Sequence, residues 1–84
     1  SQGKYLEAGS LCEQSLAIRE KVLGLEHPRV AQSLNTLAEV SRAQVKYGKA
    51  GLLYERSLAI RENALGPEHP AVAQSLNNMA ELSR

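Results

Sequence analysis

Two histidines offer the widest choice of chemistry in this sequence. His27 and His69 each stand between a glutamate and a proline. An imidazole beside a carboxylate can bind zinc or transfer a proton. A zinc site needs three or four ligands that converge at about 2.0–2.3 Å from the ion, whereas these two histidines lie 42 residues apart. We therefore interpret both as residues of a helix entrance, and we expect no metal site.

Cys12 is the single cysteine of the chain. It has no second cysteine with which to form an internal disulfide, and no histidine lies near it in sequence to make it a nucleophile. Its position on an apolar stripe favours a small core residue. The sequence also contains no phosphate-binding loop and no nucleophile elbow. We therefore expect the chain not to be an enzyme and to need no cofactor.

A repeated set of polar side chains is the better candidate for a site. Spacings of three, four and three residues place the members of the set on one face of a helix. A carboxamide there can donate to a backbone carbonyl and accept from a backbone N–H, which suits binding of an extended peptide, and the charged members could add selectivity. The alternative is an ordinary wet face of an amphipathic helix. The set comprises Gln32, Asn35, Glu39 and Arg42, with the copies Gln74, Asn77, Glu81 and Arg84.

Charged side chains of both signs occupy a different pair of predicted helices. Arg19 and Glu20 on the first of them, and Arg56 and Arg61 on the second, are examples. Mixed signs at close spacing are typical of a solvated face with weak ion pairs. We interpret these residues in that way and place no site among them.

The sequence repeats itself with a fixed period. The segment SLAIRE at 15–20 returns at 57–62, and VAQSLN at 30–35 returns at 72–77, both 42 residues later. A fixed period of this length is the signature of a tandem-repeat architecture. The 84 residues are thus interpreted as a single fragment of a repeat array, 1–84, with units 1–42 and 43–84.

Each unit carries the signals of two helices. Apolar residues recur every three or four positions, Gly24 and Gly66 stand where a left-handed residue ends a helix, and Pro28 and Pro70 suit the first position of the next helix. The short links make neighbouring helices antiparallel. We predict an all-α fold of antiparallel helix pairs stacked as an α-solenoid. The expected helices span about 4–23, 28–43, 46–65 and 70–84, and the expected loop and cap residues are Gly24, His27, Pro28, Gly66, His69 and Pro70.

Several motifs that recur together resemble the tetratricopeptide repeat family. They are L-x-x-L-A at 34–38 and Y-x-x-A at 47–50, and the 42-residue period with L-G-x-E-H-P at 23–28 is similar to the repeats of kinesin light chains and nephrocystin-3. The resemblance implies a protein-interaction scaffold in which the helix starting near Pro28 lines a concave surface. A partner peptide is expected to bind there, on the polar set defined above. Val45 departs from the family pattern, which has a glycine at this turn.

The resemblance also implies that the chain starts with the second helix of one pair and ends with the first helix of another. We therefore expect a fragment of a longer array. The alternative function is self-association, either head-to-tail or by helix exchange, because the two end helices would each lack a neighbour.

The composition excludes other classes of partner. The formal net charge is +1, with 43% hydrophobic residues, so no basic patch is expected to bind nucleic acid. No apolar run approaches the roughly 20 residues of a membrane span. A single cysteine fits a reducing compartment, and a cytoplasmic location is expected.

Overall fold

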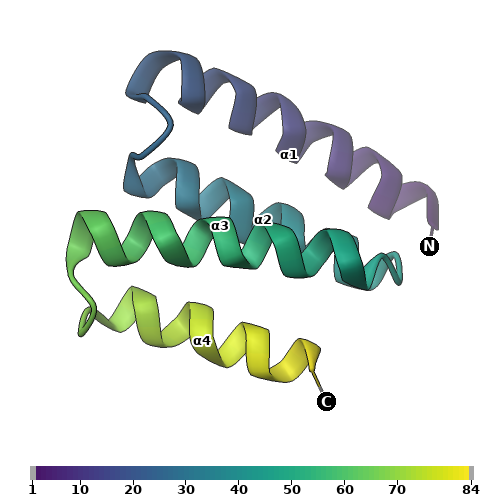
Figure 1. Ribbon diagram of the computed structural model, residues 1–84. Helices are drawn as coiled ribbons and strands as arrows, with labels where there is room; N and C mark the ends of the chain where they lie inside the picture. The colour runs from purple at the N-terminus through teal and green to yellow at the C-terminus, as the bar shows by residue number, and fades with distance from the viewer. Residues whose placement is uncertain (1, 84) are drawn as a thin grey trace.

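The computed structural model describes residues 2–83, and its regular elements are all α-helices. Successive helices run antiparallel in a flat slab with extents of 37 × 34 × 17 Å (Figure 1). The predicted all-α class with four helices is confirmed. The helices are α1 (Gln2–Leu23), α2 (Pro28–Ala43), α3 (Tyr47–Leu65) and α4 (Pro70–Leu82).

The helices α2 and α4 begin with the same local arrangement of residues. α2 begins at Pro28 and α4 at Pro70, where the missing N–H leaves no hydrogen bond unmade. Before the first proline, His27 Nδ1 accepts a hydrogen bond from the backbone N–H of Arg29 at 3.0 Å, and His69 makes the corresponding bond at 3.0 Å. The two histidines thus cap α2 and α4 by accepting from an otherwise unpaired backbone donor.

A residue with positive φ follows each of the helices α1, α2 and α3, and this residue is a glycine after α1 and α3 and a valine after α2. Gly24 and Gly66 follow α1 and α3 with φ of 88° and 91°. After α2 the corresponding residue is Val45, with φ of 65°, the one non-glycine residue at positive φ in the range 2–83. A β-branched side chain in this region crowds the backbone, so the turn between α2 and α3 is strained.

Replacing Val45 with glycine is expected to raise the free energy of unfolding by about 1 kcal/mol, because glycine adopts positive φ without a Cβ clash. Little packing is lost, since the Val45 side chain is exposed. Urea denaturation followed by circular dichroism measures the change. Val45→Ala is the control, and it should gain less because it keeps the Cβ. A glycine variant that is less stable than the native chain would show that packing of the Val45 side chain, in the hollow that Tyr5 and Leu6 also line, contributes more free energy than the backbone strain costs.

The core lies between α2 and α3, which share the largest interface of the fold. Val30, Ala31 and Leu34 of α2 enclose Ile60 of α3, and a second cluster surrounds Tyr54. α1 packs against α2 and α4 packs against α3, each on the outside of this central pair. Among the described side chains of α1 none is fully buried. The stability of the end helices therefore depends on the central pair.

The interpretation of Arg61 as a solvated residue is wrong. Its side chain is 7% exposed because the first turns of α4 cover it. The Nη1 group donates to Ala71 O at 3.1 Å, Ser75 Oγ at 2.9 Å and Gln74 Oε1 at 3.4 Å. Burial lowers the pKa of the Arg61 guanidinium from its ordinary value. Arg61 therefore joins α3 to α4 through neutral oxygens.

Two ion pairs connect the repeats along one layer of the fold. Arg56 of α3 contacts Glu20 of α1 at 2.6 Å, and Lys49 of α3 contacts Glu13 of α1 at 3.4 Å. Three of the four side chains are exposed and Glu20 is half-buried, so each pair contributes less than about 1 kcal/mol. The two pairs link α1 to α3 through long side chains.

Candidate functional site

The asparagine of the predicted polar set on α2 is buried rather than exposed. Asn35 is 6% exposed. Its Oδ1 accepts a hydrogen bond from Asn78 Nδ2 of α4 at 3.2 Å, and its Nδ2 donates to Glu39 Oε1 at 3.2 Å. The alternative of an ordinary wet helix face does not hold at Asn35, because α4 lies against that flank of α2. Asn35 joins the two helices and orients Glu39.

The glutamines of the set are bound to arginines of the neighbouring helices. Gln32 Oε1 accepts from Arg19 Nη1 at 3.1 Å, and Gln74 Oε1 accepts from Arg61 Nη1 at 3.4 Å. Both glutamine side chains remain exposed. Since the carbonyl oxygen of each is used, the amide N–H₂ group is the part that can donate to another molecule.

The remaining members of the set are divided between two places. Asn77 is exposed on α4, on the flank that corresponds to the covered flank of Asn35 on α2. Glu39, Arg42 and Glu81 instead surround a hollow of about 590 Å³. Arg84 lies outside the described residues. The predicted eight-residue set is therefore not one continuous surface.

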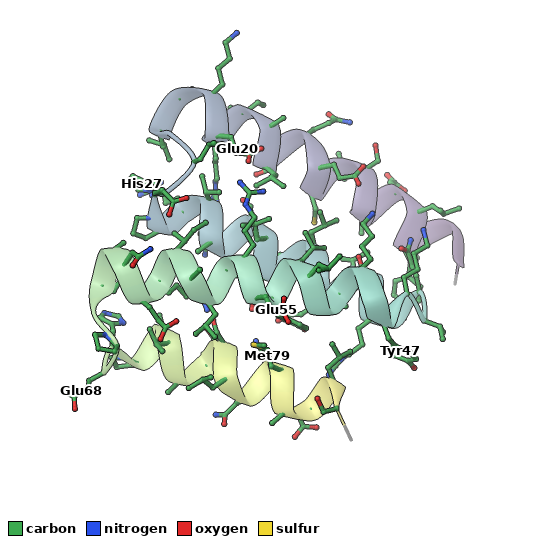
Figure 2. The ribbon with its side chains drawn as sticks, in the orientation of Figure 1. Glu20, His27, Tyr47, Glu55, Glu68 and Met79 are labelled. Atoms are coloured by element: carbon green, nitrogen blue, oxygen red, sulfur yellow. The ribbon has the colours of Figure 1, made fainter. Side chains whose placement is uncertain are left out.

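The hollow lies where the last turns of α2 and α4 meet the start of α3. We call it the α2/α4 groove, and its lining residues are Glu39, Arg42, Ala43, Tyr47, Glu81 and Leu82. Tyr47 stands at the start of α3 (Figure 2) and is about half exposed. In the sequence, Tyr47 is distinguished only as the first residue of the Y-x-x-A motif at 47–50. Its exposure could have been anticipated from Lys46 and Gly48 beside it, which leave it without apolar neighbours in sequence.

The charged residues of the groove affect the pKa of a buried tyrosine in the core beneath it. Burial raises the pKa of the Tyr54 phenol above its ordinary value of 10.0, the charge of Arg42 opposes this shift, and the charge of Glu39 adds to it. The groove thus carries charges of both signs above a tyrosine that belongs to the core.

The other reactive residues do not form a site. In the part of the chain that the structure describes, no three side chains of histidine, cysteine, aspartate or glutamate come close enough together to bind a metal ion. His27 lies at the α1–α2 turn and Glu68 points away from the helices at the α3–α4 turn (Figure 2). Cys12 is a free, half-buried thiol on α1. Within residues 2–83, none of the helices combines the length and the hydrophobicity that a membrane span requires.

Antiparallel helix pairs that repeat every 42 residues and present a groove between equivalent helices define a helical-repeat scaffold. A family model described as tetratricopeptide repeat matches residues 1–63. The chain belongs to the tetratricopeptide repeat family, which suggests a protein–protein interaction module. No curated protein matches the chain. The similarity to kinesin light chain and nephrocystin-3 repeats remains a prediction.

Proposed function

We propose that the α2/α4 groove binds an extended segment of a partner protein. The observation that carries the proposal is the hollow of about 590 Å³ lined by side chains from three helices. Binding sites in proteins are typically concave and contain a few convergent polar groups on a largely formed surface. Family membership supports a protein as the partner.

The charges of the groove suit a segment with a basic side chain. Glu39 and Glu81 supply two carboxylates, and Arg42 supplies one guanidinium. A lysine or arginine of the partner would lie between the carboxylates, while Arg42 would contact a carbonyl or an acidic side chain. Tyr47 offers an aromatic face for an apolar or cationic neighbour.

The asparagine and the glutamines take supporting roles in this proposal. Asn35 holds Glu39 in place and joins α2 to α4 rather than meeting the partner with a fully exposed amide. Gln32 and Gln74 extend the binding surface toward the starts of α2 and α4, where their amide groups can donate to backbone carbonyls. Asn77 lies away from the groove and is left out of it.

A random peptide library displayed on phage, selected against the immobilised 84-residue chain, tests the proposal. The enriched peptides are expected to contain a basic residue. The double variant Glu39→Lys/Glu81→Lys should weaken their binding by at least about 10-fold, because it replaces attraction with repulsion. Isothermal titration calorimetry measures the affinities.

A matched control separates the groove from net charge. Glu26→Lys/Glu68→Lys makes the same change of charge at the turns before α2 and α4 and should leave the affinity unchanged. If both double variants weakened peptide binding equally, long-range electrostatics rather than contacts in the groove would explain the loss of affinity. Equal binding by the groove variant and the native chain, or a library that yields no binder, would rule out the groove as the site.

A further inference from the structure

A chain of two hydrogen bonds fixes one carboxylate of the α2/α4 groove. Asn78 Nδ2 of α4 donates to Asn35 Oδ1 of α2, and Asn35 Nδ2 donates to Glu39 Oε1, each at 3.2 Å. The Asn35 side chain is buried, whereas Glu39 is exposed. The position of the Glu39 carboxylate is therefore set by a buried amide, which is itself bound to the neighbouring helix.

The two oxygens of the Glu39 carboxylate differ in what they can still accept. Oε1 accepts from Asn35, whereas Oε2 has no hydrogen-bond or ion-pair partner within residues 2–83. An arginine that binds a carboxylate in the bidentate way uses both oxygens at once. At Glu39 such an arginine would have to share Oε1 with the Asn35 amide. The carboxylate therefore suits a donor that needs one oxygen.

The other charged residues of the groove limit how many cations it can hold. Glu81 is the counterpart of Glu39, 42 residues later, and lines the same hollow as Arg42. Two carboxylates and one guanidinium leave one net negative charge at neutral pH. One cationic side chain of a partner neutralises this charge. A second one would be repelled by Arg42 without a further carboxylate to offset the repulsion.

We infer that the groove selects one unmodified lysine of the partner over an arginine. An ammonium is a compact charge with three N–H donors, so it can donate to one oxygen of Glu39 and to the Glu81 carboxylate together. A guanidinium is a flat fork that pairs best with both oxygens of one carboxylate. The inference rests on the proposed function of the groove and specifies the side chain that the groove recognises. Asn35 acts through Glu39 and is a positioning residue.

Lysine acetylation of the partner would control binding at this site. Acetylation replaces the ammonium with a neutral amide, so the attraction to Glu39 and Glu81 is lost. The amide also keeps a single N–H group, which cannot donate to both carboxylates. The unmodified partner is therefore expected to bind, and the acetylated partner is expected to be released.

Two phage libraries, with identical random positions around a fixed central lysine or a fixed central arginine, test the selectivity. Both are selected against the immobilised 84-residue chain, and enriched peptides are synthesised with lysine, arginine, norleucine or Nε-acetyl-lysine at the centre. By isothermal titration calorimetry the lysine form should bind at least about 5-fold more tightly than the arginine form, in peptides from both libraries. The norleucine and acetyl-lysine forms should each lose at least about 10-fold, because they keep the apolar stem without the charge.

The Asn35→Ala variant tests the positioning role through the ratio of the lysine and arginine affinities. Without the amide donor both oxygens of Glu39 become available to arginine, so the ratio should fall below about 2-fold. Asn78→Ala is the matched control. It also removes the bond between Asn35 and Asn78, but it keeps Asn35 Nδ2 beside Glu39, so the ratio should change less. A loss of stability alone weakens both peptide forms equally and leaves the ratio unchanged.

The outcomes separate the selectivity from the groove itself. Arginine forms that bind the native chain as tightly as lysine forms would overturn the selectivity, and an unchanged ratio in Asn35→Ala would overturn the role of Asn35. If Glu39→Lys/Glu81→Lys still weakened binding in those cases, the groove would remain the binding site. Peptides that bind this double variant as tightly as the native chain, or an absence of binders from both libraries, would overturn both the selectivity and the proposed function.

Discussion

Replacing Tyr54 with alanine is expected to lower the free energy of unfolding by about 3–5 kcal/mol, the range found when a large buried aromatic residue is truncated. Tyr54 is 0% exposed and packs with Ala38 and Ala50, and Met79 and Leu82 of α4 lie against the same cluster. Its removal therefore loosens α4 as well as the central pair. Because a chain of this length has a small total stability, much of the variant should be unfolded at 25 °C. Urea denaturation followed by circular dichroism gives the change.

The chain contains its own control for this substitution. Cys12 occupies the equivalent position on α1 but is only half-buried, so Cys12→Ala should cost less than about 1 kcal/mol. Tyr54→Phe keeps the ring and should likewise have a small effect. A loss below about 1 kcal/mol for Tyr54→Ala would show that the ring does not hold the second cluster together.

The Arg61→Ala variant is expected to lose about 2–3 kcal/mol of unfolding free energy. Hydrogen bonds from a charged donor contribute more than neutral ones, and their loss leaves buried acceptors unpaired. The acceptors all lie in the first turns of α4: Ser75 Oγ is buried, Ala71 O belongs to a half-buried residue and Gln74 Oε1 to an exposed side chain. The loss should concentrate in α4, where hydrogen exchange of the backbone amides would become faster. Urea denaturation measures the total change.

Arg19 is the matched control, because it makes the same three kinds of bond in the first repeat. It donates to Arg29 O, Gln32 Oε1 and Ser33 Oγ at 2.9–3.1 Å, but its side chain is only partly buried. Arg19→Ala should therefore cost clearly less than Arg61→Ala, because water can replace the lost donor. Equal losses would mean that burial of the guanidinium contributes nothing.

The helices could be predicted because their signals are local. Gly24 and Pro28 mark a boundary through backbone preferences that need no tertiary context, and Gly66 and Pro70 repeat them. The 42-residue offset then fixed which residues are equivalent. Val45 departs from the family pattern, which has a glycine at this turn. Its positive φ shows that the turn has the same sign of φ as the turns at Gly24 and Gly66 although valine replaces glycine.

The environment of individual polar residues could not be predicted in the same way. A helical wheel places Asn35 on the polar side of α2, but α4 covers that flank and a hydrogen bond from Asn78 reaches it. Arg61 looks like a surface charge in a list of mixed signs, yet α4 buries it. Periodicity describes one helix at a time, whereas burial here depends on the helix stacked beside it. The candidate groove was therefore only partly anticipated, through Glu39, Arg42 and Glu81.

The unequal anchoring of the helices bears on how a partner would be bound. α4 has only Val72 and Ser75 fully buried among its described residues, while α2 has eight such residues. The end helix is thus expected to open locally at a lower free-energy cost than the central pair. A segment held by Glu39 and Glu81 would bind only when α4 is docked, so binding and docking are thermodynamically linked. Affinity should then respond to Arg61, a residue that the partner never touches.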